Sequence, residues 1–277
     1  MKVYNGIIKN MIDLHIHSTY SDGTDTIEEI IKEAKLQNLS QIAITDHNTI
    51  FGSTKANIME PNLAIVGIEL SVGYKDEELH LLGYFPNGSP TIYKNINYII
   101  KLGEINKNLA VTEMIERLNN QGYDISVNEL AQFSSGTINR VHICRALMKH
   151  GYIKSVSEGF DTLIGDHCPA YVAREYVSIV EASQAIHDDG GIAVIAHPYN
   201  YKKIKDIPQL LGDIKDMIDG IECFHYTAKP QDSVYLINYA KENGKIITGG
   251  SDYHGKNKNN VFLNMMKVSD QYSIQTK

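Results

Sequence analysis

The chain has 277 residues, of which 43% are hydrophobic, and its 26 Lys and Arg against 33 Asp and Glu give a net charge of −7. This length and hydrophobic content suffice for one large α/β domain or for a domain that carries a sizeable insertion. The negative charge argues against sequence-independent binding to long nucleic acid, whereas a short phosphorylated ligand needs only a local cationic site.

The expected compartment is the cytoplasm. No apolar stretch approaches the length of a membrane span, and residues 1–10 lack the basic-then-apolar order of a signal peptide. Cys144, Cys168 and Cys223 are odd in number and lack metal-type spacing, which suits small buried residues or reduced thiols. The sequence predicts no membrane partner and leaves the oligomeric state open.

In chain order, short apolar runs of strand length alternate for the most part with patterns of helical spacing. The helical patterns cover residues 26–39, with Thr26 as the cap, 178–191 and 232–244. This alternation predicts parallel strands joined by helical crossovers, and thus an α/β fold. The strand-like runs are residues 11–17, 41–47, 63–71, 79–85, 191–198, 220–226 and 245–254.

Residues 88–170 break this alternation with consecutive helical stretches and hardly any strand signal between them. We interpret them as a helical insertion that splits an α/β domain into residues 1–87 and 171–277. Residues 269–277 are expected to be a frayed tail.

Polar side chains gather at the C-terminal ends of the strand-like runs. In a barrel of parallel strands, residues at these ends converge on one rim even when they are distant in the chain. Any one of these histidines, taken alone, is more often a structural residue than a ligand. The strand-end residues are His15, His17, Asp46, His47, Glu69, His197, His225, Asp252 and His254, while Asp22 follows in a turn and His80 opens its run.

Together these residues form a nitrogen and oxygen ligand set that suits Zn²⁺, Mn²⁺ or Fe²⁺ and is too large for one ion. Several ions a few ångströms apart suit hydrolysis of a phosphate ester, because they activate a water and neutralise the attacking and leaving oxygens. Glu69 stands between two histidine clusters in the sequence and is the candidate to bridge such ions.

Six motifs, in order, resemble those of the polymerase and histidinol phosphatase (PHP) family of metal-dependent phosphoesterases. They are DLHIHSTYSDG, ITDHNTI, GIELS, HLLGYF, AHP and GSDYHG. The resemblance covers nearly the whole chain and implies a distorted (β/α) barrel with a trinuclear metal site and a helical insertion.

The resemblance also implies a division of the ligands among two or three divalent ions (Mn, Zn or Fe). His15, His17, Glu69 and Asp252 would hold the first ion, and Glu69, His80 and His197 the second. Asp22, His47 and His254 would hold the third. We expect a metal-bridging hydroxide to attack the phosphorus in line with the leaving oxygen, with Asp252 and Glu69 as catalytic residues and no covalent phosphoenzyme.

Three further strand-end residues have both a functional and a structural interpretation. Asp46 is expected to orient His47 or a neighbouring strand rather than to bind metal directly. Asp13 is placed similarly before His15, with a structural hydrogen bond as the alternative. His225 is a candidate catalytic acid or substrate contact, and a structural role is nearly as consistent with its position.

Two arginine-bearing stretches, NRVHICRAL and PAYVAREYVS, resemble the PHP subgroup that acts on nucleoside 3′,5′-bisphosphates and short 5′-phosphorylated RNA. The resemblance implies that the insertion caps the metal site and that Arg140, His142 and Arg174 bind the substrate, since guanidinium groups pair well with phosphate oxygens. The subgroup has an arginine-rich start to the insertion's long helix, where this chain offers only Lys107.

Three alternatives remain open. A histidinol-phosphate-type or other small-molecule phosphatase is one, although that branch usually has histidine in place of Asp22. A metal-dependent amidohydrolase is another, although it often has a carboxylated lysine in place of Glu69. A third is an inactive metal-binding domain that serves a polymerase, although such domains commonly lose ligands and every expected position is filled here.

Overall fold

The structure is a computed structural model that describes residues 10–88, 93–133 and 138–275. Contacts divide the chain into two compact units, one formed by Met1–Ile100 with Val177–Lys277 and the other by Lys101–Tyr176. Within the described ranges, no helix is long and apolar enough to cross a membrane.

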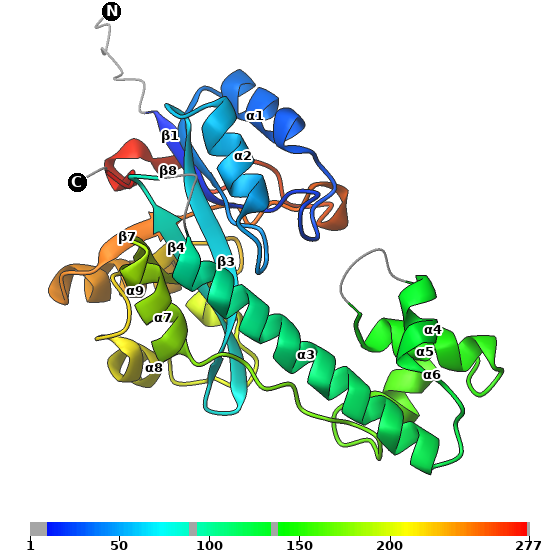
Figure 1. The fold of residues 1–277 in the computed structure, drawn as a ribbon. Helices are drawn as coiled ribbons and strands as arrows, with labels where there is room; N and C mark the ends of the chain where they lie inside the picture. Colours follow the sequence, from blue (N-terminus) through cyan, green and yellow to red (C-terminus); the bar gives the residue numbers. More distant parts are fainter. Residues whose placement is uncertain (1–9, 89–92, 134–137, 276–277) are drawn as a thin grey trace, which may run out of the picture. The chain divides into compact units, whose positions relative to one another are not determined.

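The first unit contains an eight-stranded sheet in the order β7-β6-β5-β4-β3-β2-β1-β8 (Figure 1). Strands β1 to β3 are mutually parallel, as are β5 to β7, while β4 is antiparallel to both β3 and β5. The strands are β1 (Met11–Ile16), β2 (Leu39–Ile44), β3 (Ala64–Tyr74), β4 (Glu77–Phe85), β5 (Ile192–Ile195), β6 (Gly220–Phe224), β7 (Ile246–Gly249) and β8 (Val268–Ser269).

The two edges of this sheet approach each other, so that the sheet nearly closes into a barrel. The segment after β7 crosses to β1, where the Asp252 N–H donates to the His15 carbonyl oxygen at 2.8 Å. Ile16 also forms a parallel bridge with Tyr253. The α/β barrel predicted from the sequence is confirmed, with one correction: β4 runs antiparallel, because only Lys75 and Asp76 connect it to β3 and no crossover helix fits.

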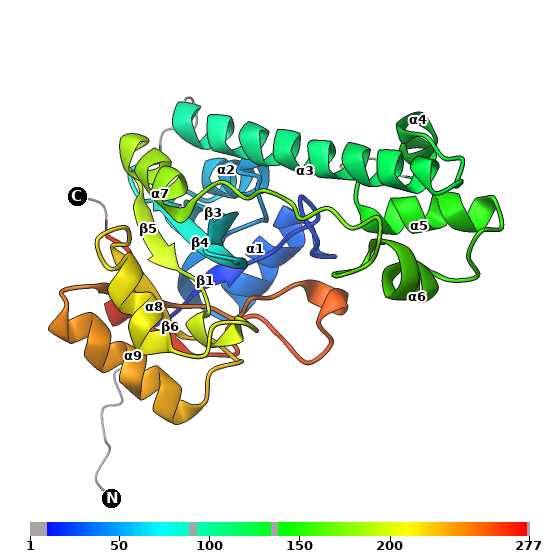
Figure 2. The same ribbon diagram turned by 90° about the horizontal axis from the view of Figure 1, so that it is seen from below.

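Helices of the first unit cover the outside of the sheet, and α9 packs on β6 and β7 (Figure 2). Helix α1 begins at the predicted cap, where the Thr26 side chain and Glu29 form a capping box. Its buried residues pack with Ile42 and Ile44 of β2 in one hydrophobic cluster. The helices are α1 (Ile27–Leu36), α2 (Phe51–Met59), α7 (Ile179–Asp188), α8 (Ile207–Ile214) and α9 (Pro230–Glu242).

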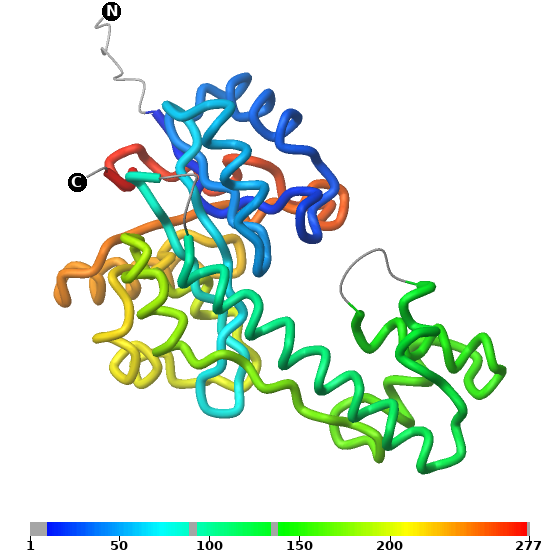
Figure 3. The backbone as a smooth tube through the Cα atoms, viewed as in Figure 1, coloured from blue at the N-terminus to red at the C-terminus, as the bar shows by residue number. Residues whose placement is uncertain are grey.

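The described part of the second unit contains helices, turns and irregular segments but no strand, and it has its own hydrophobic core. Helix α3 (Lys94–Asn120) begins in the first unit and continues into the second, where α4 (Val127–Leu130), α5 (Arg140–Lys149) and α6 (Val156–Gly159) follow (Figure 3). The core includes Leu118, Leu130, Ile143 and Ile164, all fully buried.

The described part of the C-terminal segment, residues 269–275, differs from the predicted frayed tail, while residues 276–277 lie outside the described residues. Ser269 and Val268 form β8 against β1, and a 3₁₀ turn follows at Asp270–Tyr272. The Gln41 side chain holds both backbone groups of Ile274, with its Nε2 donating to the carbonyl oxygen at 2.9 Å and its Oε1 accepting from the N–H at 2.8 Å. Long-range backbone pairing therefore orders a segment whose composition alone predicts disorder.

Candidate metal centre

A buried carboxylate, Glu69 on β3, lies at the centre of the convergent strand ends. Its Oε2 lies 3.3, 3.1 and 3.1 Å from ring nitrogens of His15, His17 and His47, respectively. Its Oε1 lies 2.8 Å from His80 Nδ1 and 3.0 Å from His197 Nε2. Five histidines from four strands or their following loops thus surround one carboxyl group.

His80 joins this group because β4 is antiparallel. It pairs with Ser71 near the end of β3, and the next residue, Leu81, pairs with Ile195 at the end of β5. The beginning of β4 therefore lies at the same rim as the carboxyl ends of its parallel neighbours. This explains why His80 opens its run while the other candidates close theirs.

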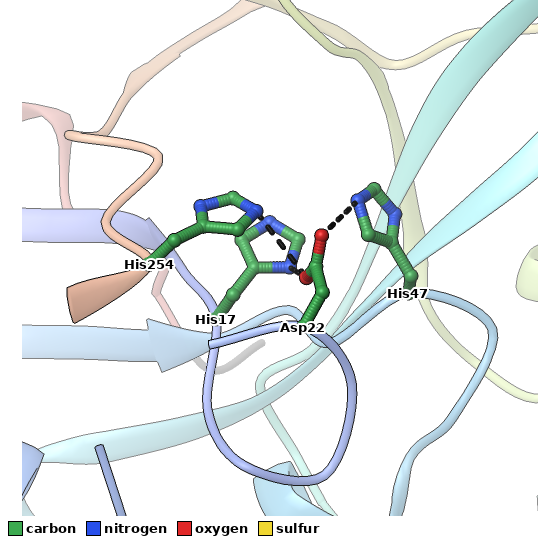
Figure 4. Close-up of side chains that lie close together, drawn as sticks. All are labelled: His17, Asp22, His47 and His254. Carbon is green, nitrogen blue, oxygen red and sulfur yellow. Dashed lines mark ion pairs between the residues drawn. The ribbon is translucent and has the colours of Figure 1, made fainter. Parts of the chain in front are cut away.

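Three groups of side chains have candidate ligand atoms within 4.8 Å of one another: His17, Asp22, His47 and His254; His15, His17 and Glu69; and His47, Glu69 and His80. Figure 4 shows the first group, with Asp22 facing the rings of His254 and His47. Asp252 Oδ1 approaches His15 Nε2 and His17 Nε2 at 3.6 and 3.4 Å.

Several ligand-type atoms at this centre are buried and have no hydrogen-bond partner among the described residues: His15 Nε2, both ring nitrogens of His17, His47 Nδ1, His197 Nδ1 and Glu69 Oε2. Buried polar atoms without partners are costly, so a protein retains them where another group uses their lone pairs. Imidazole nitrogens and carboxylate oxygens are the donors that divalent transition-metal ions bind, so the residues present fit such ions.

The close contacts between carboxylates and imidazoles shift the pKa values of both kinds of group. Burial alone would raise the pKa of Glu69, but the nearby His80, His47 and His15 hold it well below its usual range. Burial opposes protonation of His17, yet its contacts with Asp22, Asp252 and Glu69 raise its pKa to about 10. The pKa of His80 is likewise raised to about 10, against the effect of burial, chiefly by the charge of Glu69.

His47 shows the opposite behaviour. Burial lowers its pKa to about 4, because the attraction of Glu69 is offset by the positive charges of His17 and His80. Negative charge and protons are therefore shared unevenly across the cluster. Cations that bind here would displace protons from His17 and His80, the histidines with raised pKa values, as metal binding generally does.

Two candidate ligands have strained backbone conformations. His197 has a φ of 28° and Asp252 a φ of 53°, both in the left-handed region that non-glycine residues rarely adopt. Such residues cluster at functional sites, where the surrounding structure holds them in place. The glycines of GGSDYHG serve this turn, because a side chain at Gly250 would clash with the backbone and Cβ of His15.

Asp13 and Asp46 are buried, and their carboxylates accept hydrogen bonds from the segments that carry candidate ligands. Asp13 Oδ1 accepts from the Ser251 N–H at 2.8 Å, which is the structural alternative considered for this residue. Asp46 Oδ1 accepts from the Ser18 N–H at 2.7 Å and from the Ser21 hydroxyl at 2.6 Å. Asp46 therefore holds the loop that carries Asp22.

His225 is fully buried and lies behind Asp252. Its Nε2 is 3.3 Å from Asp252 Oδ2, and its Nδ1 is 2.7 Å from the Thr227 hydroxyl. The same Asp252 oxygen accepts from the Lys258 ammonium at 2.6 Å. Sequence reasoning missed Lys258 because nothing in the sequence shows that the loop after His254 returns to Asp252.

The candidate substrate residues all lie in the second unit. The Arg140 guanidinium stacks on Phe160 and contacts Asp166 Oδ1 at 3.4 Å. His142 Nδ1 accepts from the Asn139 N–H at 3.0 Å, and the Arg174 guanidinium lies over Tyr176. These contacts orient the side chains within the unit, and their role in substrate binding stays a prediction.

Comparisons with known proteins agree with this geometry. The family model described as "PHP domain" matches residues 13–219. A solved structure from Bifidobacterium adolescentis, assigned as a metal-dependent phosphoesterase, superposes with a TM-score of 0.70 at 28% identity and covers 95% of this chain and 94% of its own. The predicted barrel of the PHP type is thereby confirmed.

Three curated relatives cover similar shares. A 5′-3′ exoribonuclease of Haemophilus influenzae is 28% identical over 87% of this chain and 89% of its own. A phosphoribosyl 1,2-cyclic phosphate 1,2-diphosphodiesterase of Eggerthella lenta is 29% identical, over 88% and 94%. A 3′,5′-nucleoside bisphosphate phosphatase of Chromobacterium violaceum is 27% identical, over 88% and 87%.

Proposed function

The chain belongs to the PHP domain family and is a metal-dependent phosphoesterase, and on that premise we propose that it hydrolyses nucleoside 3′,5′-bisphosphates or short 5′-phosphorylated oligonucleotides. The observation that carries the proposal is the position of Glu69, with five imidazoles around one buried carboxylate. A centre of this size suits two or three divalent ions, with Mn²⁺, Zn²⁺ and Fe²⁺ as candidates.

The ligand sets proposed from the sequence are compatible with this geometry. His15, His17, Glu69 and Asp252 would hold one ion, and Glu69, His80 and His197 a second. Asp22, His47 and His254 would hold a third, with His17 close to the same group. When bound, such ions lower the pKa of a water and neutralise charge on phosphate oxygens.

The exposure of the side chains indicates where the substrate enters. His15 and His17 are fully buried, whereas 55% of the Asp22 side chain, 27% of His47 and 25% of His80 are exposed. A phosphate group would therefore approach from the side on which Asp22, His47 and His80 are exposed. His225, which is fully buried, contacts the Asp252 carboxylate, and the Lys258 ammonium, with 31% of its side chain exposed, contacts the same carboxylate oxygen.

The relatives support phosphate esters of nucleotides or ribose as substrates. Two of them are named for a nucleoside bisphosphate or for RNA, and the third for a cyclic phosphate of ribose. Arg140, His142 and Arg174 are the candidate contacts to substrate phosphate, since a guanidinium group can give bidentate contacts to phosphate oxygens. A cytoplasmic location is consistent with Cys144, Cys168 and Cys223 as free thiols.

The test measures product release by Mn²⁺-loaded protein from three esters: a nucleoside 3′,5′-bisphosphate, a 5′-phosphorylated trinucleotide and a phosphoribosyl 1,2-cyclic phosphate. Asp252→Asn at matched metal content is the control. We expect release from one of the first two, abolished by the substitution. Hydrolysis of the cyclic phosphate alone would overturn the nucleotide assignment, and inactivity of the metal-loaded protein on every ester would overturn the proposal.

A further inference from the structure

A second buried carboxylate, Glu222 on β6, lies beside the metal centre and belongs to none of the ligand sets. Its Oε1 accepts from His15 Nδ1 at 2.9 Å, and its Oε2 accepts from the backbone N–H of His197 at 2.8 Å. The residue is 1% exposed. Both oxygens are therefore occupied by groups that belong to candidate ligands.

The contact with His15 determines which ring nitrogen carries hydrogen. A carboxylate only accepts, so His15 Nδ1 must be the donor and Nε2 keeps its lone pair in the neutral ring. That Nε2 faces Glu69 and Asp252, at 3.3 and 3.6 Å, and has no hydrogen-bond partner among the described residues. Glu222 thus presents His15 in the tautomer that can bind a cation on the inner side of the cluster.

The contact with His197 acts on the backbone. His197 adopts φ 28° and ψ 62°, at the point where β5 ends and the turn Pro198–Asn200 begins. A non-glycine residue in such a conformation is strained and persists only where its surroundings hold it. The Glu222 carboxylate supplies one such constraint, and the His197 ring then reaches Glu69 Oε1 at 3.0 Å.

We propose that Glu222 is a positioning residue that aligns ligands of two different ions at once, His15 for the first and His197 for the second. The inference rests on the proposed function, because it assumes the ligand sets given there. It goes further because it assigns one buried side chain, Glu222, to both ion sites. Glu222 acts through its hydrogen bonds to His15 and His197 and is not itself a proposed metal ligand.

The decisive variant is Glu222→Gln. Glutamine has the same shape but carries an NH₂ group in place of one oxygen, so it can accept at only one of the two positions, His15 Nδ1 or the His197 N–H, and places a donor at the other. Loss of such supporting hydrogen bonds typically weakens metal affinity by about 10–100-fold. We expect a loss of that size in chelator-competition titrations with Zn²⁺ and Mn²⁺, together with a lower metal content after dialysis.

The chain offers a matched control in Asp219, just before β6. Its Oδ2 accepts from the Ala193 N–H at 2.8 Å and lies 2.7 Å from the His187 ring, so it also joins a backbone amide of β5 to a histidine. This pair lies at the opposite ends of the strands from the metal centre. Asp219→Asn should therefore leave metal affinity unchanged.

A spectroscopic readout separates positioning from a merely structural role. In Zn²⁺-loaded protein, ring ¹⁵N spectra should show His15 protonated at Nδ1, and Glu222→Gln should alter that signal. Glu222→Asp keeps both accepting oxygens, and we expect it to retain more affinity than Glu222→Gln. If Glu222→Gln impairs folding, the comparison of Glu222→Asp with the wild type still tests the proposal, because the shorter side chain moves the carboxylate away from His15 Nδ1 and the His197 N–H.

The outcomes are distinguishable. Wild-type protein that binds ions, together with a folded Glu222→Gln protein of equal affinity and unchanged His15 signal, would overturn this inference and leave the proposed function intact. Wild-type protein that binds no divalent ion would overturn the proposed function and the inference with it. A lower free energy of unfolding of the metal-free variant, without any loss of affinity, would assign Glu222 a structural role only.

Discussion

At the scale of single residues, Asp252 is the side chain whose loss should affect turnover most directly. Its carboxylate lies within 3.6 Å of His15, His17, His225 and Lys258. Asp252→Asn removes the negative charge but keeps the shape, and we expect kcat to fall by about 10³-fold, the cost typical of a lost electrostatic contact at a reaction centre.

This prediction is checked by steady-state kinetics at equal metal content per chain. Denaturant unfolding of the metal-free variant serves as the control for folding. A variant that binds metal like the wild type and turns over substrate at an undiminished rate would exclude Asp252 from the reaction.

The raised pKa values of His17 and His80 predict how the stability of the metal-free protein depends on pH. His17 and His80 have pKa values of about 10 in the folded chain, above the unfolded value near 6.5. The folded state therefore binds these protons more tightly, so their stabilisation is complete below about pH 6.5 and is lost as the pH rises towards 10. We expect the free energy of unfolding of chelator-treated protein to decrease between pH 6.5 and pH 9.

Metal affinity should change in the opposite direction. The same protons must leave before an ion can use the ring nitrogens, so affinity should rise over the pH range in which stability falls. Urea unfolding and metal titration in the same buffers measure both quantities. Parallel rather than opposed trends would contradict the assignment of His17 and His80 as protonated partners of Glu69.

Most candidate ligands were predictable from the sequence because they stand in short motifs at strand ends. Glu222 was not, because its contacts are made over long separations, 207 residues to His15 and 25 to His197. A glutamate inside an apolar run also resembles any other buried polar residue until its partners are known. The supporting role expected for Asp46 stays a prediction, and its partners Ser18 and Ser21 emerge only from the fold.

At the scale of secondary-structure elements, the turn after β7 depends on close approach to β1. A Cβ at Gly250 would collide with the His15 backbone, so one chain segment would have to move. We expect Gly250→Ala to lower the free energy of unfolding by about 1–3 kcal/mol, as overpacking does, and to weaken metal binding as well, because Asp252 follows in the same turn.

Gly212 in α8 provides the matched control, since a Cβ there meets no atom within 4 Å. Gly212→Ala should stabilise the protein by about 0.5–1 kcal/mol through helix propensity. Urea unfolding and metal content of both variants test the pair. Equal, small effects of the two substitutions would show that the β7 turn tolerates a side chain and that the approach to β1 does not position Asp252.

The direction of β4 shows what periodicity leaves undetermined. Its apolar pattern predicts a strand, but strand direction depends on the length of the connection, and a two-residue link permits only an antiparallel neighbour. The sequence did contain this signal, because only residues 72–78 separate the two strand-like runs, too few for a helical crossover. The pairing of β8 with β1 had no comparable signal, because two residues carry no periodicity.

At the scale of the whole molecule, the two units should respond differently to metal. All proposed ligands belong to the first unit, and the second has its own core around Leu118, Leu130 and Ile143. Because ions that bind only the folded state stabilise it by about 2.7 kcal/mol at a hundredfold excess over Kd, Mn²⁺ should slow amide hydrogen exchange at the strand ends and their loops. Exchange in α4 and α5 should change little.

A phosphorylated ligand should extend this protection if the insertion binds substrate. With Mn²⁺ and a nucleoside 5′-monophosphate present, we expect additional protection around Arg140 and His142 and around Arg174. Arg140→Lys keeps the charge but loses the bidentate fork, and should raise KM with little change in kcat. Protection confined to the first unit, with an unchanged KM for the arginine variant, would contradict a substrate cap and leave substrate recognition to the barrel alone.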